Sequence, residues 1–361
     1  MGIEIKLTDR EFPISAVFVD FLHRHIEGRA QEPTWFDQLS EDLIPAQSEE
    51  RRQAAMAVVE AVVGHPAGQK AILRSYELLT DILTGQPEKL RYFQDRYRFV
   101  CVAGCPRHGG SYLTKQLFLA LGMAPEEVPN AVAHDGFPDA SPFQFRENFN
   151  SQLVMMQNMA EYLAMVEVFF ANSRMHDNFV MVPKKATKAA YQGAFFHAML
   201  GPETEYLITL RHPVAAAIST YEKSTGLPAG GKFRVRGNIE EWARRDALHA
   251  GANPATLDDQ DYFDVYLRYW EQYHLHLALS GLAAAPRRRI VVYGRERMLA
   301  CASEYFSRFR SKAAAEDFKV FDKRERHPDW MKKSEPAIRR VAEFWDSVGM
   351  GFPLDEMMEA W

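Results

Sequence analysis

Apolar residues recur at helical spacing in the first 94 residues of the chain, with stretches at 17–26, 49–63 and 71–83. Gly85, Gln86 and Pro87 follow the last of these stretches, and glycine and proline commonly interrupt a helix. We therefore expect an N-terminal helical region over residues 1–94 that ends near this point.

Beyond residue 94 the pattern changes, because short β-branched runs alternate with longer helical stretches. Strands are predicted at residues 98–103, 178–182, 205–210 and 289–293, and their nearly continuous apolar character is typical of parallel strands covered on both faces. Helices are predicted at 111–121, 151–172, 186–200, 214–223, 239–249 and 261–280. The alternation predicts an α/β domain over residues 95–320, with three α/β/α layers and a central parallel sheet like that of P-loop NTPases. Residues 321–361 are expected to form a helical tail that packs on this core.

Composition restricts the kind of ligand and setting. Lys and Arg total 43 against 48 Asp and Glu, and the net charge of −5 argues against a general nucleic-acid binder, so an anionic ligand would need local positive charge. The three cysteines, Cys101, Cys105 and Cys301, are too few and too scattered for a disulfide framework or a zinc site, which favours a reduced, cytoplasmic setting. No stretch approaches the ~18 uncharged apolar residues that a membrane span needs, and the N-terminus shows no targeting or anchoring pattern.

The sharpest local feature is the segment Gly104-Cys-Pro-Arg-His-Gly-Gly-Ser111, which follows a predicted strand and precedes a predicted helix. A G-x-x-x-x-G-K-[ST] loop in this setting binds phosphate through converging backbone N–H groups and the helix N-terminus. Here Gly110 stands where the lysine belongs, and the positive charge lies within the loop on Arg107. The alternative is a tight glycine turn that binds nothing, but the strand-loop-helix context favours a phosphate site.

This loop resembles the 5′-phosphosulfate loop of sulfotransferases that use 3′-phosphoadenosine 5′-phosphosulfate (PAPS), which commonly reads Pro-Lys-Ser-Gly-Thr-Thr-x-Leu. The segment Pro106-Arg-His-Gly-Gly-Ser-Tyr-Leu113 has the same length and layout. The resemblance implies that Arg107 stabilises the departing phosphate and that Ser111 binds the 5′-phosphate. An arginine in place of the family's lysine supplies charge but no proton. The donor-binding residues implied by the loop are Pro106, Arg107, His108, Gly109, Gly110, Ser111 and Tyr112.

A second segment that resembles the same family follows the predicted strand at 205–210. Sulfotransferases have Arg-x-Pro followed by a helix, with a serine eight residues after the arginine, and this chain has Arg211-His-Pro213 and Ser219. In the family this pair binds the 3′-phosphate, which the resemblance transfers to Arg211 and Ser219. Eight residues are slightly more than two helical turns, so both side chains can return to one face. The alternative is that Arg211 caps a sheet edge and Ser219 has no role.

Two weaker matches extend the resemblance to about residues 97–315. Residues 266–275 resemble the family's aromatic helix, and residues 290–299 resemble its following Tyr-Glu-Asp-Leu strand, although Gly294 and Arg295 replace the acidic pair. The family's C-terminal Arg-Lys-Gly motif is not present as such. Lys323 and Arg324 either replace it or belong to a solvated charge run.

The resemblance leaves the general base open. In the family the base follows the first helix, which points to His134 or Asp135, with His134 favoured because a base poised near neutral pH is most useful. Lys185, with Lys184 beside it, lies where many sulfotransferases have a lysine near the sulfuryl group. The implied catalytic set is thus Arg107, His134 and Lys185. Equally open are a loop histidine that bonds its own turn and a pair of exposed lysines without function.

Acceptor contacts are the least defined part of the prediction. Segments 130–145 and 224–237, rich in Gly, Pro and polar residues, are predicted to be lids or substrate loops. Several aromatic residues either floor an apolar acceptor pocket or belong to the core: Phe137, Phe143, Phe145, Tyr191, Phe195 and Phe196.

The resemblance implies a PAPS-dependent sulfotransferase that acts on a hydroxyl or amine of a small molecule or glycan and releases adenosine 3′,5′-bisphosphate (PAP). This chemistry requires no metal, and neither nucleic acid nor a membrane is expected as a partner; self-association into a homo-oligomer is left open. The alternatives are a P-loop kinase of nucleotides or small molecules, against which the missing lysine argues, and a non-catalytic nucleotide-binding protein.

Overall fold

The computed structural model describes residues 14–28, 49–134, 137–138, 149–221, 243, 253–320 and 327–360. The chain forms two compact units, each assembled from separate stretches of sequence. Unit 1 comprises Met1–Val100, Leu121–Lys188 and Phe195–Thr204, and unit 2 comprises Cys101–Ala120, Ala189–Ala194 and Glu205–Trp361.

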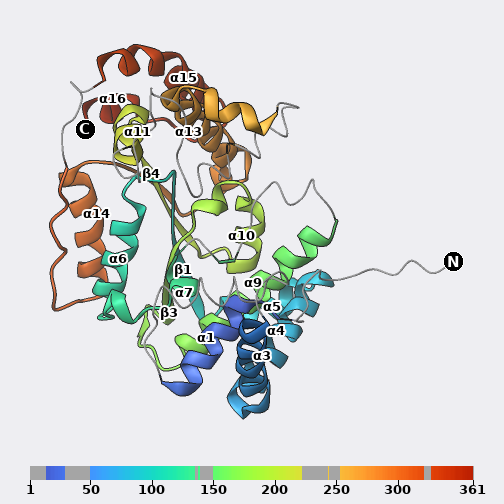
Figure 1. The fold of residues 1–361 in the computed structure, drawn as a ribbon. Helices are drawn as coiled ribbons and strands as arrows, with labels where there is room; N and C mark the ends of the chain where they lie inside the picture. The colour runs from blue at the N-terminus through green and yellow to red at the C-terminus, as the bar shows by residue number, and fades with distance from the viewer. Residues whose placement is uncertain are drawn as a thin grey trace. The chain divides into compact units, whose positions relative to one another are not determined.

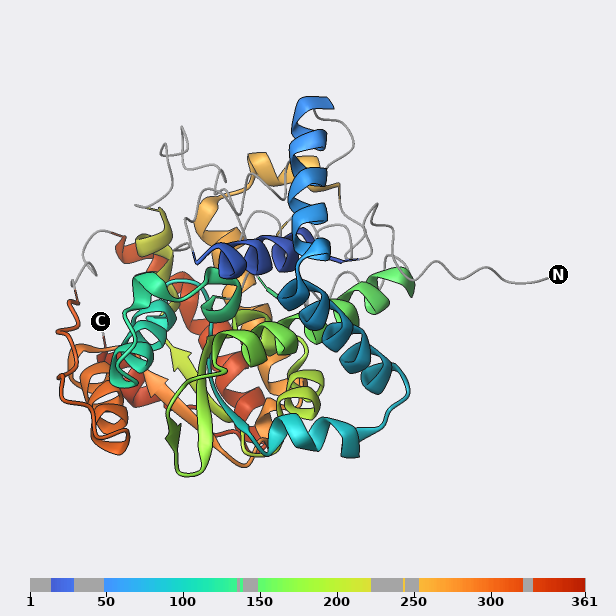
Figure 2. The ribbon, with the colours of Figure 1, turned by 90° about the horizontal axis from the view of Figure 1, so that it is seen from below.

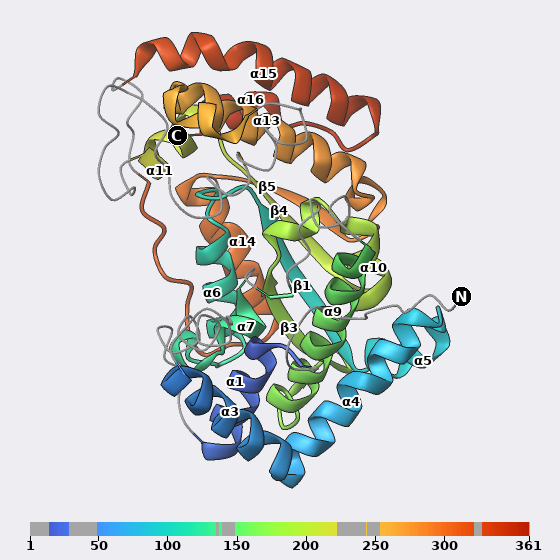
Figure 3. The same cartoon turned by 45° about the vertical axis from the view of Figure 1, so that its right-hand side comes forward.

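Unit 1 is mainly helical. Its helices are α1 (Ala16–Glu27), α3 (Glu49–Gly64), α4 (Pro66–Leu83), α5 (Pro87–Gln94), the short α7 (Asn130–Ala133) and α9 (Phe149–Phe169). Helix α4 lies along α9, and α1 packs on α3, α4 and α9 (Figure 3). Helices α3 and α4 follow one another with a bend between them (Figure 2). A buried polar contact fixes α1, because Ser15, its N-cap, donates from its backbone N to Glu161 of α9 at 2.9 Å.

Unit 2 carries the helix that follows the first strand and the helices of the chain from Glu205 onward. They are α6 (Gly110–Ala120), α11 (Pro213–Tyr221), α13 (Tyr262–Leu279), α14 (Arg295–Arg308), α15 (Pro328–Ser347) and α16 (Leu354–Glu359). Helices α6 and α14 lie side by side, and α15 lies along α13 (Figures 1 and 3). Trp345 of α15 donates its indole N–H to His274 O of α13 at 2.8 Å, which fixes this second pair.

The five-stranded sheet has the order β2-β3-β1-β4-β5 and is mostly parallel. Its strands are β1 (Tyr97–Gly104), β2 (Met175–His176), β3 (Phe179–Lys185), β4 (Glu205–Leu210) and β5 (Arg288–Val292). Strands β4 and β5 pair in parallel with Ile208 opposite Ile290, whereas β2 and β3 form an antiparallel edge hairpin. Every residue of β1 is buried, as expected for a central strand. The predicted α/β class is therefore confirmed.

The predicted elements differ from the observed ones where local signals have more than one meaning. Pro87 does not only end the helical stretch but begins α5, since proline suits the first turn of a helix. The helix predicted at 186–200 is interrupted: a 3-10 turn (Thr187–Ala190) precedes α10 (Gly193–Leu200). No helix was expected at α14, and no strand at the two-residue β2. Residues 224–237, and all of 239–249 except Ala243, lie outside the described residues.

Candidate functional site

The phosphate-loop segment begins at the end of β1, where Gly104 lies tightly against β4. Gly104 is the last residue of β1, and a Cβ at this position would lie 1.8 Å from Thr209 Oγ1 and 3.0 Å from Thr209 O. A Cβ atom cannot lie 1.8 Å from a hydroxyl oxygen, so a residue larger than glycine would force Thr209 of β4 to shift. The loop therefore leaves the sheet at a fixed point beside β4.

The loop first makes a tight turn that places Arg107 at its tip. His108 N donates to Cys105 O at 3.2 Å, Pro106 occupies the second position, and Arg107 occupies the third with φ of 71°. This is the pattern of a type II turn, whose third residue is usually glycine. Arg107 therefore holds a strained backbone conformation while its side chain is exposed.

The second half of the loop ends at the N-terminus of α6. Gly109 has φ of 88°, which favours glycine; a Cβ there would lie 2.4 Å from Met298 Cε, the movable end of a flexible side chain. Helix α6 begins at Gly110, with Ser111 exposed in its first turn. The first N–H groups of a helix have no acceptor within the helix and attract anions.

Arg211 is the most unusual charge near the loop. It is only 6% exposed, donates from Nη1 to Arg107 O at 3.0 Å, and places Cζ 3.8 Å from the ring centre of Tyr293. Its Nε has no hydrogen-bond partner, and within the described residues no carboxylate pairs with it. Burial lowers the pKa of Arg211, yet a guanidinium stays protonated at neutral pH. A buried cation without a counter-charge is costly, so an anion bound here would be strongly favoured.

The structure also brings Arg107 and Ser219 together. Arg107 Nε donates to Ser219 Oγ at 3.1 Å, and Ser219 lies on α11, which Pro213 begins three residues after β4. The expected convergence of Arg211 and Ser219 on one region is thus geometrically reasonable, since both contact Arg107. The two groups assigned by resemblance to opposite ends of the nucleotide, Arg107 and Ser219, here contact each other directly.

His108 lies differently from its neighbours in the loop. Its side chain is fully buried, Nδ1 is 3.1 Å from Thr209 O, and the ring stacks 5.4 Å from that of His274. Burial, and secondarily the adjacent His274, lower the pKa of His108 well below its usual value. His108 can therefore contribute to ligand binding through its backbone but not through an exposed imidazole.

Tyr112 is the last of the loop residues predicted to bind the donor. Its side chain contacts residues 316–318. Its hydroxyl donates to Glu316 O at 2.6 Å, and its ring lies 4.6 Å from that of Phe318. Gln116, one turn further along α6, exchanges two hydrogen bonds with Glu316, one at 2.8 Å and one at 3.0 Å. Residues 316–318 thus hold the first turns of α6 in place.

The other predicted catalytic residues lie in unit 1, where two adjacent lysines have different environments. Lys184 is 1% exposed and lies within β3; its ammonium donates to four backbone carbonyls, those of Ala131, Val132, His134 and Phe137. The alternative of two exposed lysines without function therefore does not hold for Lys184, which is buried. Lys185 is half-buried, and its Nζ lies 3.3 Å from Nε2 of the exposed His134. The structure thus brings His134 and Lys185 together and makes Lys184 a structural cation.

Most of the remaining predicted residues fall outside the part of the chain that the structure describes. Asp135, Phe143, Phe145, Lys323 and Arg324 lie outside the described residues. Phe137 and Phe196 are buried at 3% and 2% exposure, which is typical of core residues.

Three residues that shape the site lie in segments 266–275 and 290–299, which the sequence analysis matched to the family without giving any of the three a role. Tyr293 lies against the Arg211 guanidinium, Trp270 donates its indole N–H to Arg211 O at 3.1 Å, and Tyr266 donates its hydroxyl to Pro106 O at 3.5 Å. Trp270 and Tyr266 share a face of α13, one turn apart, so a stripe of aromatic residues is the signal that could have found them.

The described residues contain no group of three or more His, Cys, Asp or Glu side chains that could hold a metal ion. The described helices include none that is both long and apolar enough to cross a membrane. Comparison of the chain with protein-family models, with curated proteins and with solved structures finds no match. A function has to be inferred from the residues and geometry of the site itself.

Proposed function

We propose that the chain is a sulfotransferase whose unit 2 binds PAPS. The observation that carries this proposal is Arg211, a buried cation with an unpartnered Nε and no carboxylate partner among the described residues, which contacts the loop between β1 and α6. A phosphate loop alone would suit many nucleotides. A second cationic centre beside it favours a nucleotide with a phosphate at each end.

The donor would contact the loop at one end and Arg211 at the other. In this proposal the 5′-phosphosulfate accepts hydrogen bonds from the N–H groups at the start of α6 and from the exposed Ser111, and the 3′-phosphate lies against Arg211 and Ser219. Because Arg107 donates to Ser219, a 3′-phosphate has to replace Arg107 there. The released guanidinium then turns toward the bridging oxygen, where negative charge develops.

The transfer step needs position and charge more than covalent help from the protein. The acceptor oxygen or nitrogen forms a bond to sulfur while the bond from sulfur to the bridging phosphate oxygen breaks, and PAP leaves with the electron pair. The proton of the acceptor passes to a general base. His134, whose Nε2 lies 3.3 Å from Lys185 within unit 1, stays a prediction for this role from the sequence alone.

A thermal-shift titration tests donor binding. PAP is expected to raise the melting temperature, whereas AMP, which lacks the 3′-phosphate, should do so weakly and ATP with Mg²⁺ not at all. Loss of a hydrogen-bonded charge costs about 1.5–3 kcal/mol, so Arg211→Ala should weaken PAP binding at least roughly tenfold.

The control is Arg339→Ala, which removes an exposed arginine from α15 of the same unit and should leave PAP binding unchanged. Stabilisation by ATP with Mg²⁺ but not by PAP would instead indicate a kinase. If Arg211→Ala bound PAP as tightly as the unaltered chain, the 3′-phosphate assignment would be wrong. Transfer itself is measured with radiolabelled PAPS and pooled hydroxylated and amino compounds, which also identifies the acceptor.

A further inference from the structure

Unit 1 contains a cavity of about 790 Å³ that includes none of the residues of the proposed donor site. Side chains from α1, α4 and α9 line it, together with Tyr92, Arg96 and Tyr97. Its size lies within the roughly 300–1,000 Å³ typical of small-molecule sites.

Much of the lining is apolar, and part of it is unusually exposed. Leu22 and Ile26 of α1 and Val168 of α9 contribute aliphatic side chains. Leu73 of α4 and Tyr92 are 62% and 68% exposed. Large apolar side chains gathered at a concave surface are typical of a site that covers an apolar ligand.

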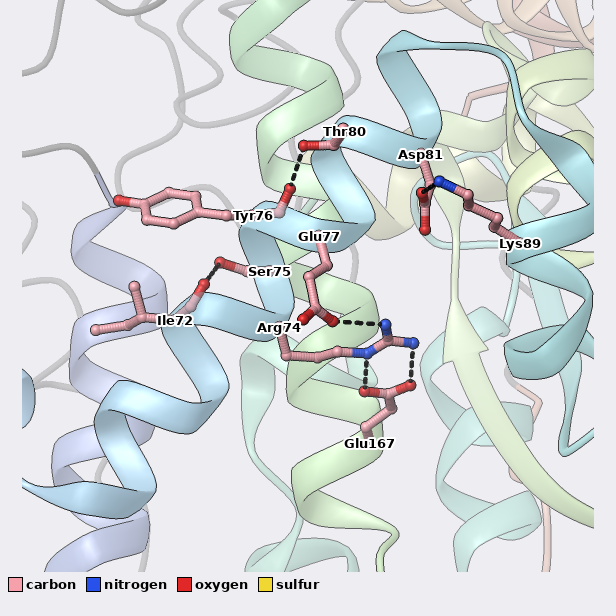
Figure 4. A network of polar contacts seen from close by, with 9 residues as sticks. All are labelled: Ile72, Arg74, Ser75, Tyr76, Glu77, Thr80, Asp81, Lys89 and Glu167. Atoms are coloured by element: carbon pink, nitrogen blue, oxygen red, sulfur yellow. Dashed lines mark hydrogen bonds and ion pairs between the residues drawn. The ribbon is translucent and has the colours of Figure 1, made fainter.

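Three of the residues that line the cavity, Arg74, Glu77 and Glu167, form an ion-pair network. Figure 4 shows this network from close by. Arg74 of α4 donates to both carboxylate oxygens of Glu167 on α9, at 2.8 and 3.0 Å, and to Glu77 at 3.1 Å. The hydrogen bond with Glu167 raises the pKa of Arg74 above its usual value, so this side chain stays charged. Since two carboxylates already compensate Arg74, this guanidinium is not available to a ligand.

Two other cations in the lining are not compensated. Lys70 lies one turn before Arg74 on the same face of α4, and it pairs with no carboxylate in the described part of the chain. Arg96 donates to Ala171 O at 3.2 Å but pairs with no carboxylate among the same residues. Among the described lining residues, three cations therefore face the two carboxylates of Glu77 and Glu167, which leaves an excess of one positive charge in this part of the wall.

We propose that this cavity binds a small amphipathic anion, with an aliphatic or aromatic body and a single carboxylate or sulfonate group. The apolar body would cover Leu73, Tyr92 and the α1 side chains, and the anionic group would accept hydrogen bonds from Lys70 and Arg96. The apolar lining provides the contact area for the body of the ligand. The excess positive charge favours a negatively charged head group over a neutral or positive one. This site is independent of the proposed sulfotransferase activity.

The test compares three ligands with the same chain and different head groups. Dodecanoate, dodecanol and dodecylammonium are titrated into the full-length protein by calorimetry, each below its micellar concentration. Dodecanoate is expected to bind at least about tenfold more tightly than the other two, because only its head group pairs with the uncompensated cations. Equal binding of all three, tighter binding of dodecylammonium, or no binding would overturn the proposal.

Variants then locate the binding. The double substitution Lys70→Gln and Arg96→Gln should weaken dodecanoate about tenfold while leaving dodecanol unchanged, since only the charged contacts are lost. Leu73→Gln should weaken all three ligands. The matched control is Leu279→Gln, because Leu279 is equally exposed, at 66%, but lies on α13 of unit 2. If the double variant bound dodecanoate like the unaltered chain, or if Leu279→Gln weakened binding as much as Leu73→Gln, the site would be elsewhere.

Discussion

Arg107 combines a strained backbone with an exposed charge, so its two contributions can be separated by substitution. Its φ of 71° lies in the left-handed region, where a residue with a Cβ is less stable than glycine. Its side chain bonds Ser219, and its carbonyl accepts from Arg211. A residue under strain at the tip of a loop is typical of a functional position.

Arg107→Gly and Arg107→Ala both remove the guanidinium but differ in the backbone. Arg107→Gly is expected to be more stable than Arg107→Ala by about 1 kcal/mol. Alanine is strained at this positive φ, whereas glycine adopts the same φ without strain. Both should lose sulfuryl transfer, and Arg107→Lys should retain part of it because the charge remains. Urea unfolding measures the stability and the radiolabel assay measures the transfer. An alanine variant as stable as the glycine variant would show that the turn is not strained.

At the scale of elements, strands were predicted more accurately than the helices around them. Residues 205–210 coincide with β4, since a buried strand between turn residues has few alternative structures. Asn178, expected in a strand, instead has φ of 67° in the β2–β3 turn, and the two residues of β2 are too few to give a periodic signal. Pro87 also starts a helix, because the effect of a proline depends on the chain that follows it.

Residues brought together by a single helix could be predicted from their spacing along the chain, whereas positions that depend on packing between distant segments could not. Arg211 and Ser219 return to one region because α11 separates them by about two turns. The interior position of His108 depends on β4 and α13, which lie about a hundred residues or more away in sequence. The same holds for Lys184, which differs from Lys185 only by the alternation of side chains along β3.

Lys184 holds β3 against the segment that carries His134, whereas the neighbouring Lys185 does not make these carbonyl contacts. Substituting each lysine in turn therefore measures how much these contacts contribute to stability. Lys184→Met leaves four carbonyls without their cationic donor and should lower the free energy of unfolding by about 3 kcal/mol or more. Lys185→Met should change it by only about 0.5 kcal/mol, as is usual for a residue outside the core. Urea denaturation of both variants gives the comparison. Equal effects would mean that the carbonyl contacts of Lys184 contribute little.

At the scale of the whole molecule, buried neutral histidines link stability to pH. Burial lowers the pKa of His274 to about 4 and that of His108 well below its usual range. Below the unfolded pKa of ~6.5 the unfolded chain binds protons that the folded chain does not, so these two residues lower stability as pH falls from about 6.5 toward 4. Above about pH 6.5 both histidines are neutral in the folded and the unfolded chain, so they do not make the free energy of unfolding depend on pH.

The predicted loss is up to about 1.4 kcal/mol per pH unit for each imidazole within that window. His274→Phe removes one titrating group, so its unfolding free energy should depend less steeply on pH than that of the unaltered chain. The measurement is urea unfolding at intervals from pH 7 to pH 4.5. Because the carboxylates titrate in both proteins, the difference in slope isolates His274, and identical slopes would contradict its assignment as a neutral buried group.

The buried guanidinium of Arg211 has a consequence for the lifetime of the protein. Any anion that binds there and not to the unfolded chain raises the free energy of unfolding in proportion to the logarithm of its concentration. Proteases attack transiently opened molecules, so a filled site slows degradation and an empty one hastens it. The abundance of such a chain in a cell would then follow the supply of the anion that fills the site.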